Sequence, residues 1–185
     1  MFALIFFWPI TLPLFIGYVT VLWKLFSKKA YYIFAMVAVA PFVAYNAFQY
    51  YWFSKVLPAQ IGITYPISIS EEGGFREGCG TAAFKVSDET LEAIRRDGIK
   101  FFSSATQARG HLSDSYYKYE EWKETPVPPS WTSEGSWMWC SGLSNETHAK
   151  IVAAAKQSGA YYTTKHEAQL ILIPSLGYVV FSFFG

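Results

Sequence analysis

The order of hydrophobic and polar residues divides the chain into two unlike parts. Residues 1–23 and 30–53 are two runs without a charged side chain. From residue 62 onward, short apolar stretches alternate with polar, glycine and proline positions, which is typical of short strands, helices and turns. The pattern therefore predicts two apolar N-terminal helices followed by one small domain.

Each apolar run is long enough, as a helix, to cross the roughly 30 Å hydrocarbon layer of a bilayer. Tryptophan and tyrosine residues stand near the ends of both runs, where such side chains anchor membrane helices in the headgroup layer. Only residues 24–29 separate the two runs. We therefore expect residues 1–53 to form a transmembrane helical hairpin with spans at about 1–23 and 30–53.

The short segment between the runs holds Lys24, Lys28 and Lys29, which are the only charged residues before residue 54. Positive residues in a short loop mark the cytoplasmic side, so both chain ends and the domain should lie outside the cytoplasm. A cleaved signal peptide is the alternative, but no basic residue precedes the first run and no small-residue cleavage site follows it. The sequence predicts a bacterial inner-membrane protein with a periplasmic C-terminal domain and a cytoplasmic loop at 24–29.

Two polar residues, Asn46 and Gln49, interrupt the second apolar run. They stand three positions apart and so share one helix face. They are candidates for an intramembrane polar contact, either to a partner helix or within the hairpin itself. Neither run contains a carboxylate or a basic residue, which argues against ion or proton conduction through this chain alone.

The rest of the chain is expected to begin with a juxtamembrane link at 54–61 and to continue as an extracytoplasmic domain at 62–185. Residues 63–70 alternate between apolar and polar side chains, and Pro66 indicates an edge strand. Residues 82–86 are typical of a second strand.

The apolar C-terminal stretch is divided by a turn sequence, Pro174 to Gly177, which argues against a third membrane span. Residues 170–173 and 178–183 have the length and composition of two buried strands. Since both are too apolar for an exposed edge, we expect a closing hairpin that is either central in the sheet or covered.

Two segments of the domain repeat one order of signals: a capping serine with acidic residues behind it, a short helix, a glycine and an apolar stretch. The segments run through Ser87, Gly98 and residues 99–103, and through Ser144, Gly159 and residues 160–164. This indicates a strand–helix–strand pseudo-duplication with both helices on one face of a shared sheet; helix capping alone is the alternative. The expected fold class is a membrane-anchored α+β protein with a mostly antiparallel sheet and two helices.

Charge is confined almost entirely to the domain. All 14 acidic residues and 12 of the 15 basic residues follow residue 53, which gives this part a net charge of −2. Such a balance lacks the positive surface that nucleic acids require.

The only two cysteines, Cys79 and Cys140, both lie in the domain. In an oxidising periplasm they are expected to form a disulfide. It would close a loop of about 60 residues and would be worth roughly 4 kcal/mol in the chain-entropy description. Free thiols or a catalytic cysteine are the alternatives, but no thiolate-stabilising residue is adjacent in the sequence.

No sequence motif predicts catalysis, a cofactor or a metal site. Residues 78–83 fit G-x-G-x-x-A, but a charged loop precedes them and a strand pattern follows, so a structural role is favoured. The three histidines have no metal-ligand spacing. His148 shares the apolar stripe of its helix, and His111 lies in one loop with Asp114, which leaves a hydrolase as an alternative.

Three tryptophans, Trp131, Trp137 and Trp139, gather before Cys140. Large aromatic side chains dominate binding surfaces as well as protein cores, so the cluster is a candidate interaction surface with core packing as the alternative.

The sequence taken together favours an anchored envelope protein whose periplasmic domain binds another protein. It would be an accessory subunit of a membrane complex or an immunity-type inhibitor, without a cofactor and without enzymatic activity. A periplasmic sensor or small-ligand-binding module is the first alternative, and a membrane-anchored hydrolase is the second.

Overall fold

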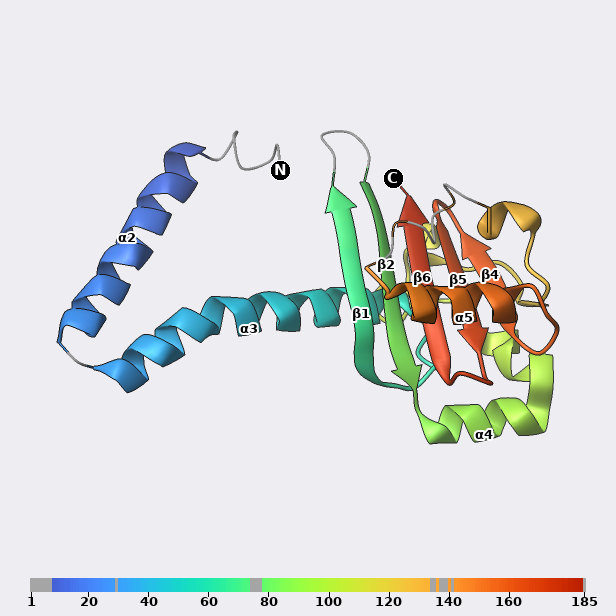
Figure 1. The fold of residues 1–185 in the computed structure, drawn as a ribbon. Helices are drawn as coiled ribbons and strands as arrows, with labels where there is room; N and C mark the ends of the chain where they lie inside the picture. The colour runs from blue at the N-terminus through green and yellow to red at the C-terminus, as the bar shows by residue number, and fades with distance from the viewer. Residues whose placement is uncertain are drawn as a thin grey trace. The chain divides into compact units, whose positions relative to one another are not determined.

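The chain folds as two compact units, Met1–Tyr51 and Trp52–Gly185. The computed structural model describes residues 8–28, 30–73, 78–133, 136, 140 and 142–184. It is an α+β protein with an apolar N-terminal helix and a six-stranded antiparallel sheet (Figure 1), which confirms that part of the expected fold class.

The first unit consists of two helices, α2 (Trp8–Ser27) and most of α3 (Tyr31–Val56). The Tyr18 hydroxyl donates to the Val37 carbonyl at 3.0 Å and so ties one helix to the other. By length and composition, α3 is the one described helix that could cross a membrane, and none of its apolar window is buried. The apolar part of α2, Leu12–Ser27, is shorter than such a span.

The second unit is built on a sheet of order β1-β2-β6-β5-β4-β3, in which every neighbouring pair is antiparallel. The strands are β1 (Ile63–Gly73), β2 (Gly78–Val86), β3 (Lys123–Glu124), β4 (Tyr161–Lys165), β5 (Ala168–Ile173) and β6 (Tyr178–Phe184). Two predictions are confirmed: the strand with Pro66 is an edge, and the apolar C-terminal hairpin is central. The hairpin is central because β5 and β6 carry too much apolar surface to face water on an edge.

The two helices of the domain, α4 (Asp88–Asp97) and α5 (Asn145–Ala155), both begin where expected. The helix α4 ends before Gly98 as predicted, whereas α5 ends at Ala155, four residues before the predicted stop at Gly159. The hydroxyls of Ser87 and Ser144 accept hydrogen bonds from backbone N–H groups three residues later, which satisfies donors that a helix start leaves open. Gly98, which follows α4, has φ +56°, a conformation that a side chain disfavours.

The predicted pseudo-duplication fails after α4. Residues 99–103, expected to be a strand, lie in the 3-10 helix η1 (Gly98–Ser104), whereas the matching segment after α5 does form β4. The reason is packing: in η1, Phe102 turns inward and stacks on Trp122 with ring centroids 4.3 Å apart. Two further single turns of 3-10 helix are η2 (Ser115–Tyr117) and η3 (Pro129–Trp131).

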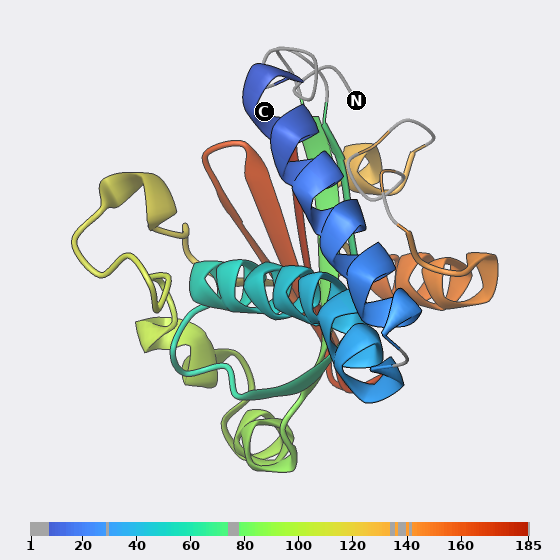
Figure 2. The same ribbon diagram turned by 90° about the vertical axis from the view of Figure 1, so that its left-hand side faces the viewer.

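The two helices also do not share a face of the sheet, contrary to the prediction. α5 covers one face, while α4 lies at the end of the sheet (Figures 1 and 2). Hydrogen bonds hold α4 there: Gly62 N–H, just before β1, donates to Thr90 Oγ1, and Ser87 N–H donates to the Gly62 carbonyl, both at 2.9 Å.

The sheet separates two apolar layers. On the α5 face, Ile151 and Ala155 pack against Ile171, Ile173 and Val180 of the central hairpin. The opposite face is covered by residues of the segment 98–124 (Figure 2) and by the last turn of α3. Phe53 of that turn packs on Phe181 and Phe183, at 6.4 and 6.1 Å between ring centroids.

Residues 54–61, expected to be a link, are instead part of the domain core. Val56, Leu57 and Ile61 are almost fully buried. The buried Tyr119 hydroxyl donates to the Val56 carbonyl at 2.8 Å, which satisfies an acceptor at the C-terminal end of α3. The segment is therefore fixed by burial and by a hydrogen bond.

Replacing Tyr119 with phenylalanine should destabilise the domain by about 1–2 kcal/mol, because the Val56 carbonyl loses its buried donor. Burial also raises the pKa of the Tyr119 phenol. The unfolded chain therefore loses this proton above about pH 10 while the folded chain keeps it, so stability falls with rising pH.

The measurement is denaturant unfolding of the detergent-solubilised full chain at pH 7, 9 and 11. The wild type should have the higher free energy of unfolding at pH 7, and its difference from Tyr119→Phe should shrink between pH 9 and 11. A difference that stays constant across this range would contradict the role given to the phenol. The pKa values of Tyr116 and Tyr161 are also raised, but both residues are present in the two proteins and their effects cancel.

Candidate functional site

A cavity of about 150 Å³ lies in the domain between the last turn of α3, η2, β6 and the turn from β4 to β5. Its lining includes aromatic and apolar residues, among them Trp52, Phe53 and Phe183. It also includes the polar or charged residues Tyr116, Tyr117, Lys165 and Glu167. We call it the Lys165 cavity. Its volume is small beside the several hundred Å³ of sites for drug-sized ligands, so it fits a group of only a few atoms.

Lys165 is a charged residue with only 9% of its surface exposed. Its Nζ lies 4.2 Å from the ring centroid of Tyr116 and 5.1 Å from that of Tyr117, and it donates to the His166 carbonyl at 3.1 Å. Burial lowers the pKa of Lys165, while the nearby carboxylates of Glu167 and Asp114 act in the opposite direction. The aromatic faces offset part of the desolvation of the ammonium group.

Glu167 stands in the two-residue turn between β4 and β5 with φ +54°. This conformation favours glycine and asparagine and costs another residue about 1–2 kcal/mol. The Glu167 carboxylate accepts a hydrogen bond from the Tyr116 hydroxyl at 3.2 Å and lies 3.5 Å from His166 Nδ1. A strained glutamate that holds a tyrosine of the cavity is a feature more typical of a functional site than of a plain turn.

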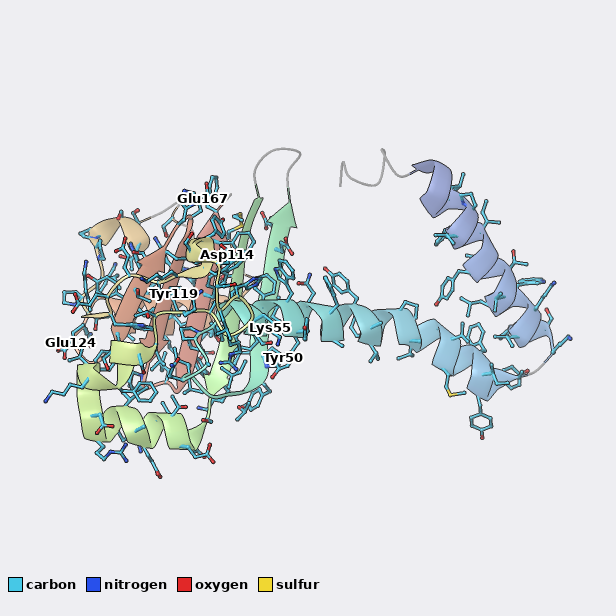
Figure 3. All side chains as sticks on the ribbon, turned by 180° about the vertical axis from the view of Figure 1, so that it is seen from behind. Tyr50, Lys55, Asp114, Tyr119, Glu124 and Glu167 are labelled. Carbon is cyan, nitrogen blue, oxygen red and sulfur yellow. A yellow bond between two sulfur atoms is a disulfide. The ribbon has the colours of Figure 1, made fainter. Side chains whose placement is uncertain are left out.

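The loop before η2 holds the two tyrosines in place. The Asp114 carboxylate accepts a hydrogen bond from the Tyr116 N–H at 2.9 Å, and the ring of His111 stacks on that of Tyr117 at 3.6 Å. Asp114 and Glu167 lie at the same end of the domain (Figure 3). The predicted pair His111 and Asp114 thus contacts the tyrosines that line the cavity, and neither residue is among the described residues of the lining itself.

A second hollow lies over η1 and residues 118–122. Its charged residues, Lys100, Lys118, Glu120 and Glu121, are all exposed. None of these four charges is buried as Lys165 is, and a buried cation has more to gain from an anionic ligand, so the Lys165 cavity is the better candidate site.

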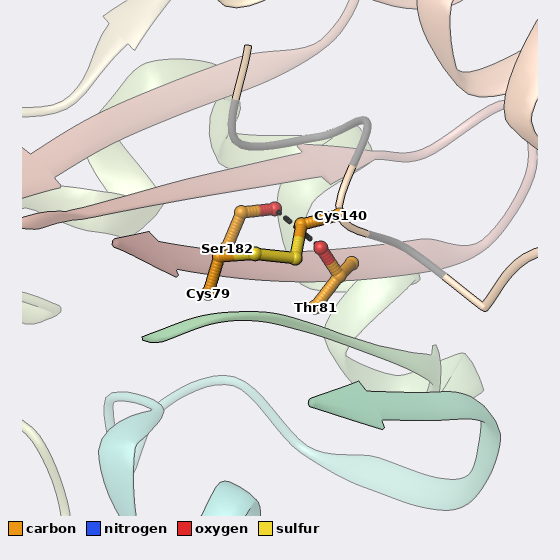
Figure 4. Close-up of a disulfide and its surroundings, with 4 residues drawn as sticks. All are labelled: Cys79, Thr81, Cys140 and Ser182. Carbon is orange, nitrogen blue, oxygen red and sulfur yellow. Dashed lines mark hydrogen bonds between the residues drawn. A yellow bond between two sulfur atoms is a disulfide. The ribbon is translucent and has the colours of Figure 1, made fainter. Parts of the chain in front are cut away.

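Cys79 and Cys140 lie at disulfide distance, with Cα atoms 6.0 Å apart, and the structure joins them (Figure 4). Beside the bond, the hydroxyls of Thr81 and Ser182 form a hydrogen bond between β2 and β6 at 3.3 Å. Glu72 offers a carboxylate oxygen close to both sulfurs, but sulfurs in a disulfide are not thiolates and do not form a metal site. The G-x-G-x-x-A residues around Cys79 belong to β2, so no helix opens on them.

The predicted tryptophan surface is not present at Trp131. This residue is buried, and its ring packs edge-on against Tyr162 at 5.1 Å within the layer under α5. It therefore belongs to the core, which was the alternative. Trp137 and Trp139 lie outside the described residues.

Asn46 and Gln49 both form hydrogen bonds within α3. The Asn46 side chain donates to the Phe42 carbonyl at 2.8 Å, and the Gln49 side chain donates to the Tyr45 hydroxyl at 2.7 Å. Each bond uses one N–H group of the side-chain amide within the same helix. His148 is half-buried on α5, as expected from its place on the apolar stripe.

Sequence reasoning missed Lys165, Glu167 and the two tyrosines. The sequence did contain one signal. Residues 165–167, Lys-His-Glu, stand between two predicted strands, at a place where a tight turn normally contains asparagine or glycine. The tyrosines come from a segment about 50 residues earlier, and only the fold brings them to this turn.

Compared with known proteins, the chain matches no family model, no curated protein and no solved structure.

The strain at Glu167 predicts an order of stability between two variants. Glu167→Gly and Glu167→Ala both lose the carboxylate, but only glycine adopts φ +54° without cost. We expect Glu167→Gly to be more stable than Glu167→Ala by about 1 kcal/mol, measured by denaturant unfolding of the full chain. Equal stabilities would mean that the turn relaxes and that no strain is held at this position.

Proposed function

We propose that the chain is an anchored protein of the bacterial inner membrane whose periplasmic α+β domain binds another protein. In this proposal α2 and α3 form a hairpin in the membrane, with the lysines of residues 24–29 on the cytoplasmic side. The domain then follows α3 on the periplasmic side. The protein partner would be a subunit of a membrane complex or the target of an immunity-type inhibitor.

The apolar surface of α3 is the observation that carries the anchoring. Its large side chains face outward: Tyr32, Met36 and Phe42 each expose well over half of their surface. A contiguous apolar surface of this kind is rare on a soluble monomer. Lipid would cover it, and the helix has the length that a bilayer requires.

The edge of β1 supports the binding of a protein. Among the described strands, β1 and β3 form the two edges of the sheet; β1 has 11 residues and β3 has two. An edge strand of that length offers backbone groups to a strand from another chain. The pairing of β1 with β2 shifts register on both sides of Pro66, which stands before the segment 67–70. Glu71 and Glu72 follow that segment. These residues disfavour unspecific pairing, so a partner strand would be confined to that short segment.

A small-ligand module remains the second candidate, because the Lys165 cavity combines a buried cation with an apolar wall. The hydrolase alternative has no comparable support, since that cavity offers no nucleophile with a histidine.

The protein-binding proposal predicts a partner in stoichiometric amount after affinity purification of the tagged full chain from mildly solubilised membranes. Tyr65 lies on β1 beside the open segment and is 57% exposed, so Tyr65→Lys should remove most of the partner by placing a charge on the edge. Leu112→Lys is the matched control, because Leu112 is also exposed, at 74%, but lies in a loop. A chain that purifies alone, or that keeps its partner in Tyr65→Lys, would contradict binding at this edge.

A further inference from the structure

We propose that the Lys165 cavity binds the headgroup of an amino-phospholipid, of the phosphatidylethanolamine type, from the outer leaflet of the membrane that holds α3. The inference rests on the proposed anchoring and adds a ligand to it. Lys165 would pair with the phosphate, and Glu167 would accept hydrogen bonds from the primary ammonium group.

The place of the cavity along the chain gives the first argument. About 20 helical residues cross the hydrocarbon layer, and α3 has 26. A span that begins at Tyr31 therefore leaves the hydrocarbon near Tyr50. Trp52 and Phe53, which line the cavity, follow directly and fall at the level of the lipid headgroups.

The chemistry of the lining gives the second argument. An ammonium group with few water contacts, such as that of Lys165, forms strong charge-assisted hydrogen bonds to a phosphate. The Glu167 carboxylate lies in the same lining and attracts a cation. The cavity therefore offers one partner for each charge of a zwitterion. A purely anionic headgroup would be repelled by the Glu167 carboxylate and would offer it no ammonium group.

The size and the apolar wall give the third argument. A volume of about 150 Å³ accepts a headgroup but not a whole lipid. Trp52, Phe183 and Phe184 are apolar residues of the lining, along which the glycerol and the first acyl carbons would lie. Because the acyl chains of a lipid stay in the bilayer, the cavity has to hold only its headgroup.

The strain at Glu167 gives the fourth argument. Glycine would fit the turn at lower cost, yet the position holds a carboxylate that also positions Tyr116. Backbone strain of this kind is found most often at functional sites, where the side chain contributes to binding or catalysis.

The test is native mass spectrometry of the purified full chain in detergent, titrated with phosphatidylethanolamine or phosphatidylcholine of identical acyl chains. The two lipids differ in that only ethanolamine offers N–H donors. We expect the wild type to bind phosphatidylethanolamine roughly tenfold more tightly, as a charge-assisted hydrogen bond implies. Glu167→Gln should abolish the preference, and Lys165→Met should weaken the binding of both lipids.

Glu124→Gln and Lys100→Met are the matched controls, because both residues are exposed and lie outside the cavity lining, and both variants should behave as the wild type. Equal binding of the two lipids, or an unchanged preference in Glu167→Gln, would overturn the inference. A third titration uses phosphatidylglycerol of identical acyl chains, and binding stronger than that of phosphatidylethanolamine would also overturn it. Soluble phosphoethanolamine that displaces the lipid at comparable concentration would overturn the lipid as the source and favour a small-molecule site.

A second experiment separates the absence of a lipid site from the absence of membrane anchoring. Alkaline carbonate extraction of membranes removes peripheral proteins and leaves integral ones. A chain that stays in the membrane but does not prefer phosphatidylethanolamine overturns only the lipid site. A chain that carbonate extracts overturns the anchoring and the lipid site together.

Discussion

The structure depends on the packing of Phe53 against Phe181 and Phe183. It joins the last turn of an apolar helix to the central strand of the sheet, between residues about 130 positions apart in the chain. A helix end leaves carbonyl groups without partners, and the Tyr119 hydroxyl satisfies one of them inside the core. The same turn also supplies part of the wall of the Lys165 cavity. The last turn of α3 therefore contacts both the core of the domain and the candidate site, and a change in its packing would affect both.

The sequence predicted those elements whose signals are local. The capping serines located both helix starts, Pro66 marked the edge strand, and the apolar hairpin at the C-terminus had to be central or covered. Predictions failed where a tertiary contact outweighed local preference. Residues 99–103 have strand composition, but burial of Phe102 against Trp122 favours a 3-10 turn. Residues 54–61 were expected to be a short link because they stand between two unlike patterns, yet Leu57 and Ile61 are fully buried.

The candidate site was beyond sequence reasoning for a related reason. Lys165 sits in an ordinary strand pattern, and nothing local shows that Tyr116 and Tyr117 will lie beside it. The tryptophan cluster attracted attention instead because large aromatic residues are conspicuous in a sequence, but Trp131 is a core residue. The burial of the Lys165 charge results from the fold and is not visible in the composition of the chain. The cavity was therefore identified from the structure.

The proposed roles of the domain are compatible with one another, because they use different parts of it. The edge of β1 and the Lys165 cavity lie on different elements of the sheet: β1 forms one edge, and Lys165 ends β4, which is four strands away. A protein partner on β1 would leave the cavity free for a lipid. Both proposals require that the domain lie outside the cytoplasm, next to the bilayer.

The compartment of the domain is therefore the central claim, and the two cysteines allow a direct measurement because the chain has no others. The experiment is labelling with a membrane-impermeant maleimide, with and without prior reduction by an impermeant phosphine. It is carried out on sealed spheroplasts and on sealed inside-out vesicles. The account predicts that Cys79 and Cys140 are labelled only after reduction and only in spheroplasts. Labelling without reduction would show free thiols, and labelling confined to inside-out vesicles would show a cytoplasmic domain; either result would contradict the account.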